Sequence, residues 1–281
     1  MLNSSAYFSH PKCHATIETP LESVIFTEYL RGTPPRMNNI AYDLAEGIAE
    51  IESRTHAHLT SLTARATFKY WCMDFFRQWF FIRPRFNFQR RLKQLNRMMD
   101  YYYSPSLSNQ NTSLLLSVTR QLEHNSIGSQ KCFSHMDYLK KNIISSQSRL
   151  QLIDWSEFKI GRIGFDGGMY LSSIFRRHTL NSFVQVKTRF LKTYISASDK
   201  KIDMEAAINN MSYIFLLYSL WNIVRPETVF PPKTSRQASE LKEKLDYLIT
   251  MSRTIEASLT GVVTQSRIDT FFPDQHRTSP F

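Results

Sequence analysis

Hydrophobic positions recur along most of the chain with the three- and four-residue spacing of an α-helix. One stripe, formed by Ile40, Leu44, Ile48 and Ile51, predicts a helix over 38–58. A densely aromatic helix is expected from about 61 to the proline at 84, and periodicity predicts helices over 84–103, 113–124, 131–148, 168–178, 181–196, 203–224 and 238–262, with a shorter one over 21–30. The pattern therefore predicts an all-α, or mostly α, bundle of about eight helices.

Two stretches break this periodicity. LQLID and FKIGRIGF alternate with the period of a strand, which allows a small β-hairpin near 150–165. Glycine is scarce, at 8 of 281 residues, which favours helices over turn-rich β folds. We expect a single helical domain over 21–268, with flexible tails at 1–20 and 269–281. Turn-forming residues at 104–113 and prolines at 224–235 mark its only candidate sub-boundaries.

Four glycines gather within eight residues: Gly161, Gly164, Gly167 and Gly168. A glycine-rich turn before a helix can bring backbone amides close to a phosphate. The spacing G-x-x-G-x-x-G-G matches neither the P-loop nor the dinucleotide-binding pattern. The favoured interpretation is therefore a tight turn in which glycine permits positive φ and Asp166 caps the next helix.

With Ile160, Phe165 and Tyr170 around it, this cluster loosely resembles the glycine-rich loop of protein kinases. The resemblance implies that FVQVK, at 183–187, corresponds to the strand that carries the kinase lysine, with Glu205 near its helical partner. No HRD-like catalytic loop and no DFG triplet occur in 206–281. Because phosphoryl transfer needs a general base and a metal-binding aspartate, this interpretation excludes a conventional kinase.

The chain is basic, with 35 Lys and Arg against 24 Asp and Glu, a net charge of +11. Such a charge favours a polyanionic partner, either nucleic acid or an acidic surface. The densest basic segment lies within 81–103, where arginine forks suit phosphate and nearby aromatics suit stacking on bases. The predicted nucleic-acid-binding residues are Arg83, Arg85, Arg90, Arg91, Lys93 and Arg97, with a weaker second group at Lys187, Arg189 and Lys192.

An ordinary amphipathic helix is the alternative for the basic segment. Its arginines would then pair with acids elsewhere, such as the face formed by Asp43, Glu46 and Glu50.

The last predicted helix has heptad spacing around a polar Ser252. Its predicted interaction residues are Leu241, Leu245, Leu248, Ile255 and Leu259. This seam favours a second class of function, a protein–protein adaptor or a regulatory or secretion-associated subunit that forms homo- or hetero-oligomers.

The sequence predicts no catalytic residue, no metal site and no cofactor. His10, Cys13 and His14 form one cluster and His56 with His58 another, but neither spacing matches a structural zinc motif. Three scattered cysteines favour a reducing compartment, and no run is long and apolar enough for a signal peptide or a membrane span. We expect a cytoplasmic protein, with uncleaved export as the open alternative.

The primary hypothesis is a non-enzymatic basic helical protein that contacts a polyanion, most readily nucleic acid, through 83–97. The second is the adaptor assembling through 238–262, with an acidic protein among its candidate partners. The third is a nucleotide-binding enzyme that uses the glycines at 161–168.

Overall fold

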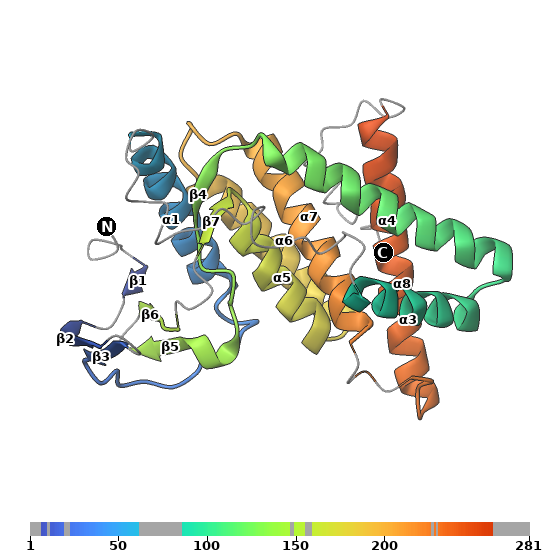
Figure 1. Cartoon of the computed structure of the whole chain (residues 1–281), viewed down its shortest axis with the longest axis horizontal. Helices are drawn as coiled ribbons and strands as arrows, with labels where there is room; N and C mark the ends of the chain where they lie inside the picture. The colour runs from blue at the N-terminus through green and yellow to red at the C-terminus, as the bar shows by residue number, and fades with distance from the viewer. Residues whose placement is uncertain are drawn as a thin grey trace, which may run out of the picture.

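Seven α-helices make up most of the described part of this computed structural model (Figure 1). The structure describes residues 7–9, 12–19, 23–61, 86–146, 149–154, 159–225, 228 and 230–260. The helices are α1 (Ala41–Ser61), α3 (Phe86–Tyr102), α4 (Pro105–Ile127), α5 (Phe165–Arg177), α6 (Leu180–Ala197), α7 (Met204–Ile223) and α8 (Ser235–Leu259). The mostly helical class is thus confirmed, whereas a pure helical bundle is wrong, because short strands accompany the helices.

Helices α5 and α7 form the centre of the molecule. They pack directly on each other, α1 packs on α6, and α4 packs on α7 (Figure 1). Helix α7 is buried around most of its circumference, as its nearly continuous apolar sequence requires. The approach of α5 to α7 is close because Gly168 lies at the contact, where a Cβ would stand 2.6 Å from the backbone oxygen of Met211.

Three of the helices begin at side-chain caps. Thr179, Asp203 and Thr234 each accept a hydrogen bond from the backbone N–H three residues further on, at the starts of α6, α7 and α8. Such caps satisfy amides that have no partner within the helix, and so they fix where the helix begins.

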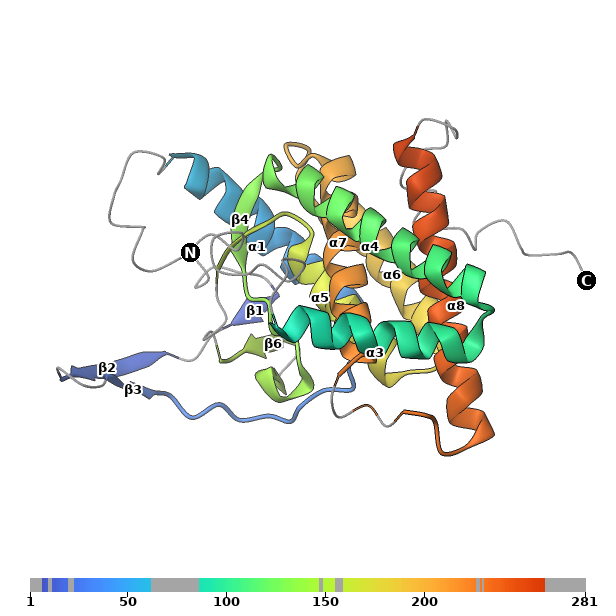
Figure 2. The same cartoon turned by 45° about the vertical axis from the view of Figure 1, so that its right-hand side comes forward.

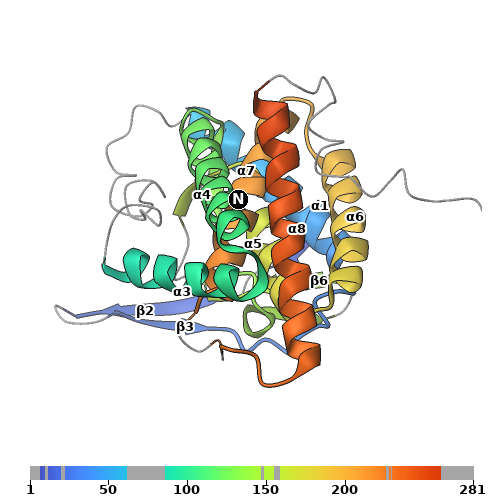
Figure 3. The same cartoon turned by 90° about the vertical axis from the view of Figure 1, so that its right-hand side faces the viewer.

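Helix α8 packs on α4 and α6, and Figure 3 shows it in front of the central helices with these two on either side. Leu245, Leu248 and Ile255 are buried, while Leu241 and Leu259 are partly buried against the same core. The predicted heptad seam therefore packs within this chain.

The strands form three small sheets. In the first, β5 (Ile143–Ser146) and β6 (Arg149–Leu152) are antiparallel, and β1 (Phe8–Ser9) runs parallel to β6. In the second, β4 (Lys131–Ser134) pairs antiparallel with β7 (Lys159–Arg162). In the third, β2 (Cys13–Glu18) and β3 (Ser23–Thr27) form an antiparallel hairpin that projects away from the helices (Figure 2).

The predicted hairpin near 150–165 is therefore corrected. Both of its strands exist, but β6 pairs with β5 and β7 pairs with β4, so they are not partners. The predicted helix over 131–148 is wrong, since this stretch contains β4, a short 3₁₀ turn η3 (Lys140–Asn142) and β5. Short apolar runs fit a helix or a strand equally well, and only strand pairing decides between them.

Two further expectations about local structure fail. The predicted helix over 21–30 contains β3 instead. The predicted loop at 104–113 lies inside α4, which starts with Pro105 at its first turn. Two of the polar side chains there have partners outside the segment: the Ser108 hydroxyl donates to Asp100 Oδ1 at 2.6 Å, and Asn111 Oδ1 accepts from Arg253 at 3.0 Å.

Within the described residues, no helix combines the length and the apolar character that crossing a bilayer requires.

Candidate active site

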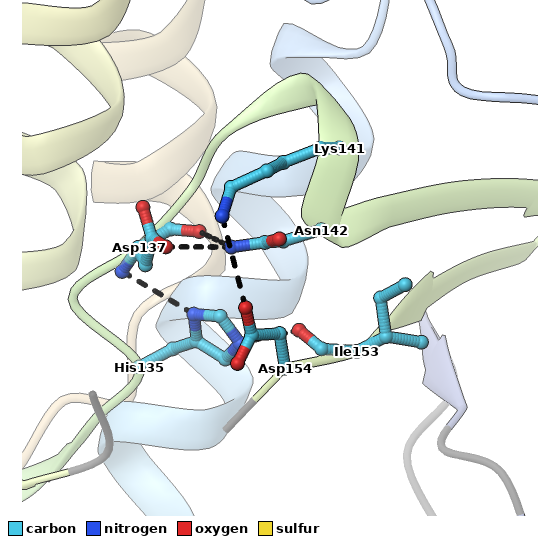
Figure 4. A network of polar contacts seen from close by, with 6 residues as sticks. All are labelled: His135, Asp137, Lys141, Asn142, Ile153 and Asp154. Atoms are coloured by element: carbon cyan, nitrogen blue, oxygen red, sulfur yellow. Dashed lines mark hydrogen bonds and ion pairs between the residues drawn. The ribbon is translucent and has the colours of Figure 1, made fainter. Parts of the chain in front are cut away.

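The loop that follows β4 brings three polar side chains together with a fourth from the end of β6. Figure 4 shows His135, Asp137 and Asn142 on the loop, with Ile153 and Asp154 beside them. The β4–β7 and β5–β6 pairings position these segments, because the loop leaves one sheet and enters the other. The cluster is therefore held by backbone pairing on both sides.

Asp137 and Asn142 are joined directly. The Asn142 amide nitrogen donates to Asp137 Oδ2 at 2.7 Å and to the Asp137 backbone oxygen at 3.1 Å (Figure 4). Both bonds need the nitrogen, since both partners are acceptors, and this assigns the amide orientation. The Asn142 Oδ1 atom is then the one that can bind a cation.

His135 ties the loop to the end of β6. Its Nδ1 accepts from the Asp137 backbone N–H at 3.3 Å, so its Nε2 carries the proton that is shared with the Ile153 carbonyl oxygen at 3.1 Å. Burial lowers the pKa of His135, which favours this neutral imidazole. The residue after Ile153 is Asp154, so His135 sets the distance between the loop and that carboxylate.

Asp154 is exposed, and its Oδ2 lies 3.8 Å from Lys141 Nζ (Figure 4). Its backbone is left-handed, at φ 58°, and so is that of Met136 in the loop, at φ 61°. Residues other than glycine seldom adopt this conformation, and where they do the surrounding structure must hold them. Two such residues in one small cluster point to a functional constraint on its shape.

A buried carboxylate beneath the loop holds the loop backbone in this conformation. Asp166, in the first turn of α5, accepts from the backbone N–H of His135 at 3.0 Å and of Met136 at 2.9 Å. The Tyr138 hydroxyl also donates to it, at 3.1 Å. Burial raises the pKa of Asp166 to about 6, while these three donors act in the opposite direction. Asp166 thus binds the backbone of the loop. The expectation that it caps its own helix is wrong, because no side chain caps the start of α5.

The spacing of these residues matches a known catalytic pattern. His135, Asp137 and Asn142 fit H-x-D-x-x-x-x-N, in which the aspartate accepts the proton of the substrate hydroxyl and the asparagine binds magnesium. Asp154 follows further along the chain, where the pattern has an aspartate that binds metal, with Trp155 and Ser156 in place of the Phe and Gly of a DFG triplet. Oxygen atoms of one or two such side chains, completed by substrate phosphates, are what Mg²⁺ requires.

Sequence reasoning missed this constellation although its signal was present. A kinase-like order that starts at the glycine cluster places the catalytic loop within 206–281. The loop precedes that cluster, at 135–142, and a search for the spacing alone would have found it. The substitutions after Asp154 also hid the second motif.

The glycine cluster has another role. Gly161 lies in β7, Gly164 has φ 85° at the start of α5, and Gly167 and Gly168 are buried within α5. The segment 183–187 is helical, as part of α6, and Glu205 lies in the first turn of α7. The glycines therefore serve a turn and close helix packing, and the kinase-like assignments based on them are wrong.

The predicted nucleic-acid-binding residues do not form one exposed face. Arg83 and Arg85 lie outside the described residues, while Arg90, Lys93 and Arg97 are exposed on α3. The Arg91 guanidinium lies 3.2 Å from the ring centre of Trp221 and donates to its carbonyl oxygen. Of the second group, Arg189 and Lys192 are exposed on α6, but Lys187 is buried and donates to the Tyr247 hydroxyl at 2.7 Å.

On the acidic face of α1, Glu50 forms an ion pair with Arg54 of its own helix at 2.7 Å. Of the histidine clusters, His10 and the His58 side chain lie outside the described residues, and His56 contacts Gln130 and the Lys131 carbonyl oxygen. The part of the chain that the structure describes holds no group of three or more His, Cys, Asp or Glu placed for a metal ion.

Two cavities open elsewhere on the molecule. One, of about 420 Å³, lies between the ends of α5 and α7 and the start of α8. The other, of about 720 Å³, runs along α1 and α6. Neither is lined by His135, Asp137, Asn142 or Asp154.

No protein-family model matches the sequence, and no curated protein matches it either. Among solved structures, a choline kinase from Cryptosporidium parvum Iowa II is similar over 94% of this chain and 78% of its own, at 13% identity and a TM-score of 0.45. A microcompartment-associated aminopropanol kinase is similar over 92% and 78%, at 14% identity and a TM-score of 0.48. A choline/ethanolamine kinase family protein from Mesorhizobium loti covers 94% and 76%, at 10% identity and a TM-score of 0.45.

The expectation of a non-enzymatic nucleic-acid binder is corrected by these comparisons. The similar structures named above are all kinases, and an aminoglycoside phosphotransferase is similar as well. These likenesses concern the path of the chain alone, and the chemistry must be argued from the residues of this protein.

Proposed function

We propose that this protein is a phosphotransferase, which moves the terminal phosphoryl group of a nucleoside triphosphate to a hydroxyl group of an acceptor. The observation that supports the proposal is the joined pair Asp137 and Asn142 with Asp154 beside it, at the spacing that phosphoryl transfer uses. Two left-handed residues and the buried Asp166 keep this cluster in shape.

In the reaction, the acceptor oxygen attacks the terminal phosphorus and forms the new O–P bond. The bond from that phosphorus to the bridging oxygen breaks, and the nucleoside diphosphate leaves with the electron pair. The hydroxyl proton passes to the Asp137 carboxylate, which Asn142 orients through its amide nitrogen.

Asn142 Oδ1 and the Asp154 carboxylate would hold magnesium, which when bound neutralises the charge of the phosphates. Asp154 and Asp137 repel each other when no ion is bound. Lys141 Nζ, at 3.8 Å from Asp154 Oδ2, reduces this electrostatic repulsion. The exposure of Asp154 leaves it open to an incoming metal–nucleotide complex.

The test is a Mg²⁺-dependent turnover assay of the full chain with ATP or GTP, alone and with a panel of hydroxyl acceptors. Asp137→Asn keeps the shape of the side chain but cannot take a proton, so turnover should fall by about 10²–10⁴-fold. Asp43→Asn, an exposed change of the same chemistry on α1, is the matched control and should leave turnover unchanged. Equal turnover of Asp137→Asn and the control would refute the proposal, as would a wild-type chain with neither turnover nor Mg²⁺-dependent nucleotide binding.

A further inference from the structure

A second buried carboxylate lies behind the loop, on a different helix. Glu52 of α1 is only 1% exposed. Its Oε1 and Oε2 both accept from the backbone N–H of Gly164, at 2.9 and 3.0 Å, and Oε2 also accepts from the Tyr194 hydroxyl of α6. A single side chain thereby joins α1 and α6 to the start of α5.

The partner of Glu52 is a backbone position that no other residue type could fill. Gly164 has φ 85°, and a Cβ there would stand 2.1 Å from the Ala207 carbonyl oxygen. Its N–H is among those at a helix start that have no acceptor within the helix. Because this N–H is buried, removing its acceptor would leave it without compensation.

Glu52 and the catalytic loop are linked through a short run of chain. Gly164 lies two residues before Asp166, whose carboxylate receives the His135 and Met136 amides. A shift or rotation of the first turn of α5 would therefore move the Asp166 oxygens away from those amides. By binding the Gly164 N–H, Glu52 therefore also keeps Asp166 in place against the loop.

We propose that Glu52 is a positioning residue for the catalytic loop, acting through the Gly164 amide and the Asp166 carboxylate. The role of the loop rests on the proposed phosphotransfer, but the mechanical link does not. Through this link helix α1 helps to position the catalytic loop, although α1 supplies none of the reacting groups.

The ionisation of Glu52 guides the choice of variants. Burial first, and then the charge of Asp166, raise its pKa to about 8, so the neutral side chain prevails at pH 7. Glu52→Gln is a close copy of that neutral form and keeps one oxygen for Gly164. Glu52→Leu has a similar volume but no acceptor, and Tyr194→Phe removes only the hydroxyl contact.

Backbone amide hydrogen exchange, measured on the full chain without nucleotide, tests the link. In Glu52→Leu the amides of Gly164, His135 and Met136 should exchange about tenfold faster relative to buried amides of α8, such as those of Leu245 and Leu248. Glu52→Gln should restore wild-type exchange, and the control Asp43→Asn should equal wild type. If Glu52→Leu does not fold, Tyr194→Phe should show the same selective change at smaller size.

Equal acceleration of the loop and of α8, or no change in the loop, would overturn the proposal, because Glu52 would then only support the fold. The exchange result does not depend on turnover, so a wild-type chain without activity refutes the phosphotransfer proposal alone. Where turnover is measured, Glu52→Leu should lower kcat and leave KM for the nucleotide unchanged, since Glu52 touches no substrate.

Discussion

At the scale of single residues, buried carboxylates distinguish this protein from an ordinary helical core. Asp166 and Glu52 are both buried, and each is surrounded by donors: backbone amides and a tyrosine hydroxyl. Such networks are costly when incomplete, because an unpaired polar group in the interior loses its hydration without compensation. Their placement under one loop indicates that they preserve the geometry of that loop.

The two carboxyls predict how stability depends on pH. The folded pKa is raised from 4.5 to about 8 for Glu52 and from 3.8 to about 6 for Asp166, in both cases first by burial. Between about pH 4 and pH 8 the unfolded chain has released protons that the folded protein retains. The free energy of unfolding should therefore fall as pH rises through this window.

Urea unfolding of wild type and Glu52→Gln at several pH values from 5 to 9 measures this effect. The wild-type midpoint should decline with pH, and the decline should be shallower in Glu52→Gln, because glutamine does not titrate. Parallel curves for the two proteins would mean that Glu52 ionises in the folded state as it does in the unfolded one.

At the scale of elements, α5 is the helix that connects the loop of the proposed site to the core. Its first turn presents Asp166 to the loop, and its glycines bring it against α7. Two of the four glycines that suggested a phosphate loop are needed here for different reasons: a left-handed turn at Gly164 and a close helix crossing at Gly168. Glycine alone offers both, since it has no Cβ.

Replacement of Gly168 by alanine should therefore destabilise the protein. The new Cβ would meet the Met211 backbone oxygen at 2.6 Å, and a backbone atom cannot move aside as a side chain can. We expect a loss of about 1–3 kcal/mol in the free energy of unfolding. Urea denaturation of wild type and Gly168→Ala measures this difference.

Gly128→Ala is the matched control. Gly128 lies at the end of α4 with φ −83°, and nothing lies within 4 Å of the place a Cβ would take. Alanine there should be neutral or stabilise by about 0.4–1 kcal/mol. Equal losses at Gly128 and Gly168 would show that the α5–α7 contact does not require glycine.

At the scale of the whole molecule, the proposed site makes stability depend on two ligands together. Magnesium with ATP at about 100 times the dissociation constant should stabilise the fold by about 2.7 kcal/mol, or roughly 5–10 °C in Tm. Either ligand alone should give much less, because Asp154 and Asn142 offer only part of a magnesium site.

Asp154→Asn should abolish most of this shift, and Asp43→Asn should retain it. A shift of the same size with ATP in the presence of EDTA would place nucleotide binding somewhere other than this cluster.

The basic charge of the molecule is another feature of the whole. The cations behind the net charge of +11 differ in exposure: Arg90, Lys93 and Arg97 are exposed on α3, whereas Arg91 packs on Trp221 and Lys187 lies inside the core. Charge along a sequence says which side chains are cationic, and only packing says which of them meet solvent.

Elements whose signals are local could be predicted from the sequence. The stripes that predicted α1, α6 and α8 hold because an amphipathic helix is specified by its own residues, and the nearly continuous apolar run of α7 is an equally local signal. The spacing of His135, Asp137 and Asn142 was equally present in the chain, although it went unrecognised there.

Contacts between residues far apart in the chain could not be predicted in this way. Strand β6 pairs with β5 and β7 with β4, and Glu52 reaches Gly164 from 112 residues away. The physical reason is that pairing and burial depend on partners brought together by the fold, whereas helix periodicity and motif spacing are carried by neighbours in the chain.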